Sequence, residues 1–514
     1  MQAEADFGAE GVGRLTGPIL AIDQNGQLCR AVLFSADHRV LATAQEDIAS
    51  IVVRSGWVEF DAEEVWSATI ATCRAVLLRA RVDPGSVAAI GISSDAGSTA
   101  LWDRNTGAPI YNVIANSDHR TDGHCKALRD GGVEGVVRGR TGQPLDSTAA
   151  ATKLSWMLDN VASARTNAEN GQLAFGGLGC FLLWRLTNGR VHATDVTSAS
   201  TSLLFNVSTQ AWDAALLDVF SIPPSVLPEV FDNATYFGAI DASLLGGAGP
   251  IGVHGMASVS SAVIVGSGGV GPGALTLSMA GGCTASLGVE RGQGTGPQET
   301  IVARLDGQTS YARLAENAAA NDPYIWARGA FDLGNGFEQA DHLALTADPD
   351  AELYMVAPRL PVGAPWGHTE VRGTVQGFQI GTSKADLVRA AMEAAAFAAR
   401  DIIEFLEADS DEARPAAKVS GGIAHSDWTM QFLADVLNRP VERSSVSQAA
   451  ALGVARMAGL GVGDWPDADD FAATLAIDRR FEPGMDEKRR DRRVRGWHRC
   501  LRLAMSREET TGGV

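Results

Sequence analysis

Hydrophobic positions at the start of the chain form short apolar runs, which are typical of strands, and one longer segment with helical spacing. The apolar run 19–22 is separated from a second run, 31–34, by a turn at Asn25-Gly26, which predicts a β-hairpin. Apolar residues at helical spacing then predict a helix over 63–80, and a short apolar segment predicts a strand over 87–92. Strands that alternate with helices in this way indicate an α/β fold.

A similar pattern begins again in the second half of the chain, where new strand-like segments start. The segments 262–265 and 274–277 surround a glycine-rich stretch and predict the hairpin of a new domain. Downstream, a strand is predicted to end at the pair Gly421-Gly422, and helical patterns are predicted over 384–406 and 447–459.

The length of the chain and its glycine-rich middle predict two domains. A chain of 514 residues exceeds what one hydrophobic core usually supports. Glycine and proline residues cluster at 246–250, which places the division near residue 250. The first sixteen residues lack the basic start and apolar run of a secretion signal, so we expect a disordered lead-in. The expected organisation is a lead-in over 1–16, a first domain over 17–250 and a second domain over 251–514.

The charge balance and the scattered cysteines limit the classes of partner and site. A net charge of −19 disfavours nucleic acid or an anionic membrane as a partner, and no apolar run is long enough to span a bilayer. The cysteines lack C-x-x-C spacing, so we expect reduced thiols in a cytoplasmic protein and no metal site. A basic run over 488–502 predicts the solvated face of a terminal helix, with an anion-binding patch as the alternative.

Short segments in a fixed order carry a resemblance that covers residues 18 to about 510. They include I-L-A-I-D-Q at 19–24, G-W-V-E-F-D at 56–61, G-A-P-W at 363–366 and A-L-G at 451–453. In these segments the chain resembles glycerol kinases of the FGGY carbohydrate-kinase family. The resemblance implies two ribonuclease-H-like domains of the actin and sugar-kinase type, with an interdomain cleft for ATP and a polyol, and a homo-oligomer.

The resemblance also implies which residue would be the catalytic base, and that residue is replaced. Phosphoryl transfer depends on a base for the attacking hydroxyl, on donors around the phosphates and on Mg²⁺. In the family the base is the Asp of a G-D-Q-Q-A-A segment, which matches S-V-S-S-A-V at 258–263 and places Val259 at the carboxylate position. Because valine accepts no proton, we expect Val259 to line the cleft between the domains, beside Ser260, without acting as a base.

The nucleotide side of the expected cleft keeps glycines and loses hydroxyl groups. The family hairpin D-x-G-T-T-S corresponds here to D-Q-N-G-Q-L at 23–28, and the family hairpin G-T-G corresponds to A-G-G at 280–282. The pair Ala320-Asn321 aligns with a family Gly-Gly pair near the nucleotide. The positions expected on the nucleotide side are Asp23, Gly26, Gly281, Gly282, Gly421 and Gly422.

The polyol side of the expected cleft is altered throughout. The Arg and Glu of the family segment N-Q-R-E-T-T correspond to Ala96 and Gly97. A pocket-wall Trp of the family aligns with Asn116, and the Tyr of D-P-Y-F aligns with Thr148. Asp95 is the one obvious carboxylate that could substitute for the missing base. Specificity for glycerol is therefore not implied by the resemblance.

The framework segments survive while the pocket segments are replaced, which favours a pseudokinase with a binding, regulatory or assembly role. For such a protein the partner would be another protein, of unknown identity, and no cofactor is expected. The alternative is an active ATP-dependent carbohydrate or polyol kinase with a rearranged site, in which Asp95 is the base and Mg-ATP is the cofactor. A third interpretation is a new activity in the altered cleft, which is rich in Ser258, Ser260 and Ser261, although their spacing indicates no nucleophile triad.

Overall fold

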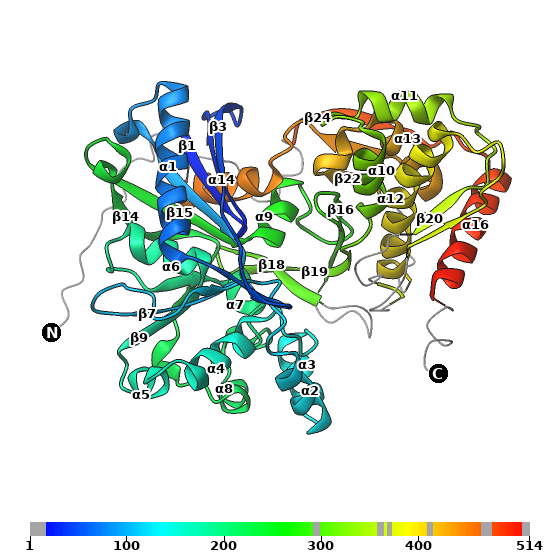
Figure 1. The fold of residues 1–514 in the computed structure, drawn as a ribbon. Helices are drawn as coiled ribbons and strands as arrows, with labels where there is room; N and C mark the ends of the chain where they lie inside the picture. Colours follow the sequence, from blue (N-terminus) through cyan, green and yellow to red (C-terminus); the bar gives the residue numbers. More distant parts are fainter. Residues whose placement is uncertain are drawn as a thin grey trace. The chain divides into compact units, whose positions relative to one another are not determined.

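The chain divides into two compact units (Figure 1). The first unit contains the chain up to Ala262 together with 303–309 and 450–471, and the remaining residues form the second unit. The predicted lead-in over 1–16 lies outside the described residues. The computed structural model describes residues 17–290, 299–356, 364–366, 373–408, 415–463 and 475–505.

The first unit is built on a six-stranded sheet with the strand order β14-β15-β6-β1-β2-β3. β1 and β2 form the predicted hairpin around Asn25-Gly26, and β3 pairs antiparallel with β2. β6 and β15 run parallel in the centre, next to β1, and β14 closes the other edge antiparallel to β15. The strands are β1 (Ile19–Gln24), β2 (Leu28–Phe34), β3 (Val40–Asp47), β6 (Ala89–Ser94), β14 (Ala234–Asp241) and β15 (Pro250–Ser258).

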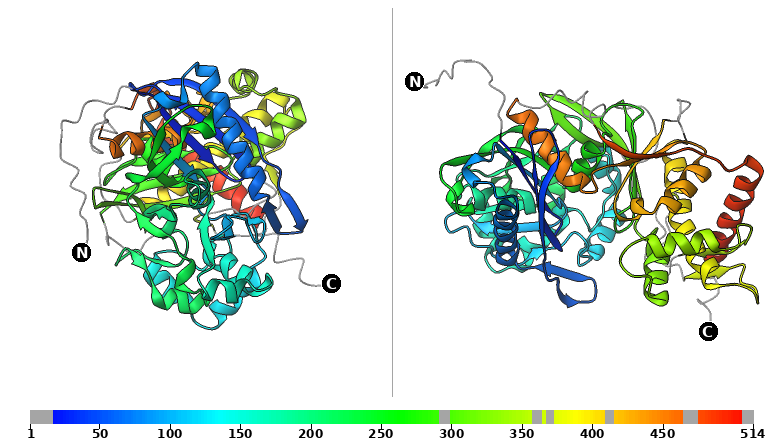
Figure 2. Two further views of the ribbon diagram at one scale, coloured as in Figure 1. Left: turned by 90° about the vertical axis from the view of Figure 1, so that its left-hand side faces the viewer. Right: turned by 90° about the horizontal axis from the view of Figure 1, so that it is seen from above.

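Helices cover both faces of this sheet, because successive side chains of a strand point to opposite sides. Leu20 of β1 belongs to the core that packs against the predicted helix, α1 (Ala62–Ala80). On the other face a Cβ atom on Gly91 of β6 would lie 2.4 Å from the carbonyl oxygen of Val454 in α14 (Ala449–Gly461). Figure 2 shows α1 in blue and α14 in orange on opposite sides of these strands.

A five-stranded sheet with the order β4-β5-β8-β7-β9 and several short helices complete the first unit. The strands are β4 (Ile51–Arg54), β5 (Trp57–Phe60), β7 (Thr99–Asp103), β8 (Val113–Ile114) and β9 (Leu173–Gly177), with two short pairs, β10 (Ala193–Asp195) with β13 (Glu229–Phe231) and β11 (Phe205–Asn206) with β12 (Ala211–Trp212). The helices are α2 (Asp122–Asp130), α3 (Glu134–Thr141), α4 (Ala150–Asn160), α5 (Ala164–Glu169), α6 (Leu178–Leu186), α7 (Val196–Ser200) and α8 (Ala214–Phe220).

The region of the predicted domain division contains a strand and a helix. β15 begins at Pro250 and pairs in parallel with β6, so the first unit continues beyond residue 250, and its first segment runs to Ala262. The segment 262–265 was expected to be a strand, and this prediction is wrong because it lies within α9 (Val259–Gly266). A short apolar run does not distinguish a strand from a buried helix.

The second unit is built on a seven-stranded sheet with the order β18-β19-β17-β16-β22-β23-β24. β16 pairs antiparallel with β17, which is the hairpin of this unit, and parallel with β22. The order again places antiparallel strands beside parallel ones, as in the first unit. The strands are β16 (Leu275–Ser278), β17 (Cys283–Val289), β18 (Glu299–Leu305), β19 (Gln308–Asn317), β22 (Ala417–Ser420), β23 (Val441–Ser444) and β24 (Ile477–Phe481), and β20 (Tyr354–Val356) pairs with β21 (Thr374–Gln376).

The long helix α12 (Lys384–Leu406) lies at the centre of the second unit and has the predicted bounds. Its start is fixed by a capping box, in which Ser383 and Asp386 satisfy each other's backbone N–H groups. Within the described residues, no helix is long and apolar enough to cross a membrane. The other helices of this unit are α10 (Asp322–Phe331), α11 (Glu338–Thr346), α13 (Asp427–Leu437) and α16 (Glu487–Met505).

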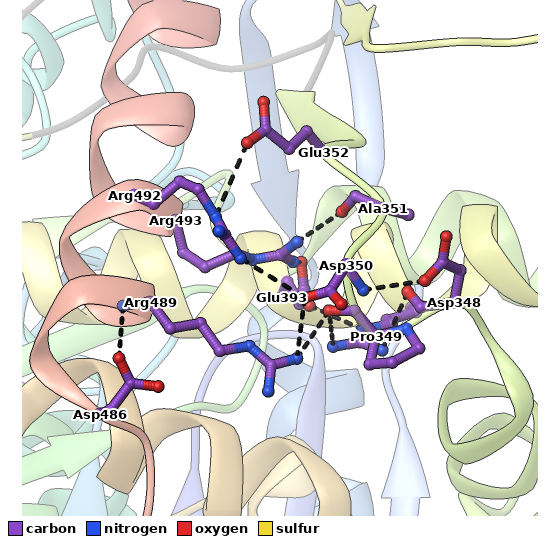
Figure 3. Close-up of polar contacts among 11 residues, drawn as sticks. Asp348, Pro349, Asp350, Ala351, Glu352, Glu393, Asp486, Arg489, Arg492 and Arg493 are labelled. Carbon is purple, nitrogen blue, oxygen red and sulfur yellow. Dashed lines mark hydrogen bonds and ion pairs between the residues drawn. The ribbon is translucent and has the colours of Figure 1, made fainter.

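The predicted basic helix is α16, but several of its arginines are not simply solvated. Arg489 donates to the carbonyl oxygen of Pro349, and Arg492 lies 3.4 Å from a carboxylate oxygen of Asp350 (Figure 3). Arg493 is buried and pairs with the buried carboxylate of Glu393 in α12. One side of α16 is therefore fastened to the acidic segment 348–352 and to α12, which the spacing of basic residues alone did not indicate.

Candidate functional site

The carboxyl ends of three parallel strands in the first unit bring several predicted site positions together. Gln24 of β1 is in register with Ser94 of β6, and Ser94 is in register with Ser258 of β15. Asp95 and Val259 each follow directly after one of these paired residues. Ligands of α/β folds bind outside such strand ends, so the sequence placed these positions at a suitable edge of the sheet.

Asp23 lies inside this edge and is held by the protein itself. Its carboxylate accepts a hydrogen bond from Ser93 Oγ at 3.2 Å and lies 3.7 Å from Arg30 Nη1. Burial raises the pKa of the Asp23 carboxyl, and the positive charge of Arg30 partly offsets this effect. Only 8% of the residue is exposed, so little of the carboxylate is available to a cation.

Gly26 forms the turn between β1 and β2 and needs to be glycine. Its φ angle is +90°, and a Cβ atom would lie 2.8 Å from Cε2 of Phe60. Further along the hairpin, the buried Cys29 directs its Sγ atom to the hydroxyl groups of Thr69 and Thr72 in α1. This part of the hairpin therefore packs into the core and offers no hydroxyl group to a phosphate.

Val259 is half-buried at the first turn of α9, and Ser260 beside it is exposed. Ser258 precedes the helix, and its Oγ accepts a hydrogen bond from the backbone N–H of Ser261 at 3.3 Å and lies 3.0 Å from Ser261 Oγ. These serines cap the helix, and no histidine among the described residues forms a hydrogen bond with either. The contacts do not assemble a nucleophile triad, and the position of Val259 relative to the second unit stays a prediction.

Asp95 forms a turn with the residues that follow it. Its Oδ1 accepts the backbone N–H of Gly97 at 3.0 Å, and its Oδ2 accepts the hydroxyl group of Ser98 at 2.6 Å. Burial raises the pKa of the Asp95 carboxyl, while the hydrogen bond from Ser98 and the positive charge of Lys153 act in the opposite direction. Both oxygens are therefore engaged, although a raised pKa is the direction that a general base requires.

The replaced polyol positions lie close together and leave no room for a side chain at residue 97. A Cβ atom on Gly97 would lie 2.2 Å from Oδ1 of Asn116 and 2.9 Å from the backbone oxygen of Thr148. The side chain of Asn116 could rotate away, because this residue is exposed, but the backbone of Thr148 could not. A family-like Glu at position 97 would therefore have to displace the loop around Thr148. Ala96 precedes this close contact and is half-buried.

Lys153 of α4 holds these loops in place, a role that the sequence did not indicate. Its Nζ atom donates to the backbone oxygens of Gly97 at 3.1 Å, Asn116 at 3.1 Å and Thr148 at 2.6 Å. The residue has no exposed surface, and burial lowers the pKa of the Lys153 ammonium to about 8. One buried cation thus joins the three segments that carry the replaced polyol positions.

Arg120 lies in the loop before α2 and is a structural residue. Its guanidinium is fully buried between the rings of Trp57 and Trp156 and pairs with Glu59 and Asp118. A buried cation that is paired and stacked in this way fixes the loop before α2. It is not available to a ligand.

In the second unit, the glycines predicted for the nucleotide side lie at the carboxyl ends of two parallel strands. Gly281 and Gly282 follow β16, and Gly421 and Gly422 follow β22. Gly421 has a φ angle of +100°, and a Cβ atom there would lie 2.6 Å from the carbonyl carbon of Met279. The two turns are therefore in direct contact, and glycine at 421 is required by this contact.

Asn321, at the start of α10, contacts the turn at 280–282. Its Nδ2 donates to the backbone oxygens of Ala280 and Gly282, both at 2.9 Å. Its Oδ1 is buried and has no hydrogen-bond partner among the described residues. The position that was aligned with a family glycine near the nucleotide thus carries a side chain that holds the A-G-G turn.

Two family models match the chain across both units. The model described as the FGGY family of carbohydrate kinases, N-terminal domain, matches residues 18–266, and the corresponding C-terminal domain matches residues 308–462. The chain belongs to the FGGY family of carbohydrate kinases. This FGGY protein is 39% identical to the glycerol kinase of Allorhizobium ampelinum over 495 residues, with 95% of this chain and 99% of the relative covered. It is 40% identical to that of Methylobacterium nodulans over 505 residues, with 96% and 99% covered.

Solved structures show the same fold. A structure of Plasmodium falciparum glycerol kinase with ADP has a TM-score of 0.85 at 23% identity and covers 95% of this chain and 98% of the other. The xylulose kinase of Lactobacillus acidophilus has a TM-score of 0.84 at 19% identity, with 96% and 99% covered. The predicted fold class, an α/β protein with two ribonuclease-H-like domains, is confirmed.

The residues present do not match the needs of Mg-ATP well. Mg²⁺ that is bound with ATP is held by one or two protein carboxylates together with the phosphates, and the carboxylate of Asp23 is buried and shared with Arg30 and Ser93. The loss of the family's hydroxyl groups from both phosphate hairpins stays a prediction from the resemblance.

Proposed function

We propose that this FGGY protein is a pseudokinase, a glycerol-kinase-like scaffold that binds, regulates or assembles with another protein and does not transfer phosphate. The observation that carries the proposal is the contact between Gly97 and Asn116. A Cβ atom on Gly97, which the resemblance aligns with the polyol-clamping Glu, would lie 2.2 Å from Oδ1 of Asn116 and 2.9 Å from the Thr148 carbonyl oxygen. A polyol would meet neither the Arg nor the Glu of the family clamp.

The valine at position 259 supports the same proposal, because a valine side chain cannot act as the base of the reaction. A positioned base contributes about 10²–10⁴ in rate, and each electrostatic donor contributes roughly 10²–10³. These contributions are not additive. The chain nevertheless lacks the base, the clamp and the phosphate hydroxyls together, so little of a typical turnover of ~10 s⁻¹ would remain.

The residues on the nucleotide side support the proposal that ATP binds weakly or not at all. Asn321 occupies a family glycine position, and the hairpin after Asp23 directs Cys29 into the core. Calorimetric titration of the full chain with Mg-ATP tests this part of the proposal. We expect no saturable heat, whereas a dissociation constant of roughly 10 μM or below would contradict the proposal.

The second candidate function is an active kinase with a rearranged base, and one observation favours it. Asp95 lies at the same sheet edge as Val259, and burial raises the pKa of its carboxyl towards the range of a general base. Activity with any polyol that is lost in Asp95→Asn would support this function. Ser98→Ala is a useful companion, because it frees Oδ2 of Asp95 without removing the carboxylate.

The setting of the protein is part of the proposal. We propose that it acts in the cytoplasm as a homo-oligomer, and that its partner is another protein. Light scattering of the purified chain measures its oligomeric state, and a monomer at micromolar concentration would contradict the proposed homo-oligomer. An affinity for a second protein that survives Asp95→Asn and Val259→Asp would separate a scaffold role from catalysis.

A further inference from the structure

The side chain of Lys153 contacts three segments that lie far apart in the sequence. Its Nζ atom donates to the backbone oxygens of Gly97, Asn116 and Thr148, and no further acceptor of Nζ occurs among the residues that the structure describes. An ammonium group has three N–H donors, so each donor has one carbonyl acceptor. The arrangement is therefore complete only while the lysine carries its proton.

A neutral amine at the same place could not make all three contacts. It has two N–H donors and one lone pair, so the lone pair would face the third carbonyl oxygen. Lys153 has no exposed surface, so bulk water cannot supply the missing donor. Because a buried carbonyl group without a donor is destabilising, loss of the proton favours the release of one carbonyl group from the amine.

The contact with Thr148 is the one that we expect to remain. It measures 2.6 Å, against 3.1 Å for each of the other two, and Thr148 precedes Lys153 by only five residues. Gly97 and Asn116 are held together separately, because Ser98 Oγ accepts the backbone N–H of Asn116 at 3.1 Å. Loss of the proton therefore weakens the link between the loop of Thr148 and these two segments.

The surroundings of Lys153 have opposite effects on its proton. Asp95, Asp118 and Asp146 favour the charged form, whereas Arg120 disfavours it. Burial is the largest effect, and it lowers the pKa of the Lys153 ammonium to about 8. The proton is therefore lost in a range of pH in which a lysine in water stays charged.

We propose that Lys153 is a pH-dependent latch, which holds the loop of Thr148 against the segments of Gly97 and Asn116 while it is charged and loosens them when it loses its proton. The three segments carry the positions expected on the polyol side of the cleft. A ligand that contacts all three would therefore bind more weakly at alkaline pH. The proposal does not depend on the loss of phosphate transfer, because it concerns the order of these segments and not the reaction.

Lysine-selective NMR of the full chain tests the first step, which is the loss of the proton. The chain has five lysines, so the signals of ¹³C-labelled Cε can be followed one by one from about pH 6.5 to 10.5. Arginine substitutions at Lys126, Lys384, Lys418 and Lys488 assign the Lys153 signal without changing this residue. We expect a midpoint below about 9 for Lys153, and a midpoint at the ordinary value of 10.5 would overturn the proposal.

A nitroxide probe beside Asn116 tests the second step, which is the loosening of the segments. All six native cysteines are buried, so Ser117→Cys supplies an exposed thiol next to Asn116, and Glu169→Cys supplies a control at another exposed position of the first unit. We expect the rotational correlation time of the probe at 117 to fall about twofold or more, with the midpoint of the Lys153 titration. The probe at 169 should not change.

Lys153→Arg is the matched variant, because a guanidinium group keeps its charge and its donors throughout this range of pH. The probe at 117 should not respond to pH in Lys153→Arg and should be mobile at every pH in Lys153→Met. A probe that stays immobile while Lys153 titrates would overturn the latch, and so would equal responses at 117 and 169, which indicate general unfolding. The titrations of chains that keep Lys153 give these outcomes even if a variant at this position does not fold.

Discussion

Oδ1 of Asn116 lies 2.2 Å from the place where a Cβ atom on Gly97 would be. The backbone oxygen of Thr148 lies 2.9 Å from the same place, and it is held by Nζ of Lys153. A residue with a side chain at position 97 would therefore collide with both neighbouring segments. If the family Glu is lost at this position, as we propose, the contacts of Gly97 with two further segments imply that one substitution cannot restore it.

We predict that the double change Ala96→Arg and Gly97→Glu restores the residue types of the clamp without restoring glycerol phosphorylation. The new Glu side chain overlaps the Thr148 carbonyl, and overpacking of this kind costs about 1–3 kcal/mol. The melting temperature of the double variant should therefore fall below that of Ala96→Arg alone. Equal melting temperatures together with glycerol turnover would contradict the close contact.

Val259→Asp tests whether a base alone is sufficient. We predict no glycerol phosphorylation, because Ala96, Gly97, Asn116 and Thr148 leave the polyol unclamped and positioning supplies as much of the barrier reduction as proton transfer does. ATP-dependent product is measured for wild type, for Val259→Asp and for Val259→Asp combined with the two clamp changes. Turnover by Val259→Asp at the rate of an ordinary kinase would show that the pocket is more intact than proposed.

The buried ammonium of Lys153 predicts a dependence of stability on pH. Its pKa is about 8 in the folded protein, below the ordinary value of 10.5, so between these values the unfolded chain binds more protons at this group. The free energy of unfolding should therefore rise with pH across this window relative to Lys153→Met, by on the order of 3 kcal/mol at most. Thermal unfolding of both proteins at pH 7.5 to 10.5 measures the difference, and a flat or falling difference would contradict the burial of a charged lysine.

We predict that the buried ion pair of Arg493 and Glu393 holds α16 against α12. Both residues are buried, so Arg493→Met leaves Oε2 of Glu393 without its partner, although Arg389 still donates to Oε1, and should destabilise this part of the second unit by about 1–3 kcal/mol. Arg492→Met removes an exposed partner of Asp350 and should cost less than ~1 kcal/mol. Hydrogen exchange of the α12 and α16 amides measures both, and equal effects of the two changes would contradict the account.

Local signals in the sequence were sufficient for part of the fold. Asn25-Gly26 between two apolar runs specifies a hairpin through its own turn chemistry, and Ser383 with Asp386 marks the start of α12 by capping. The segment 262–265 was misassigned, because a short run of buried residues suits either a strand or a helix.

The contacts that decide the candidate site could not be predicted in this way. Lys153 reaches a backbone oxygen 56 residues away at Gly97, and Asn321 reaches back to a turn at Ala280. Spacing along the chain does not indicate contacts between segments this distant. The proposed replacements at Val259 and Gly97 rest on the family resemblance alone and stay predictions.

The most direct test of the central claim is transfer of labelled phosphate from Mg-ATP by the unmodified full chain to glycerol and to a panel of polyols and sugars. We predict no product above the background of a heat-denatured control with any acceptor. Product formed with one acceptor, and abolished in Asp95→Asn while the folded state is retained, would contradict the pseudokinase proposal and identify this protein as a kinase with a rearranged base.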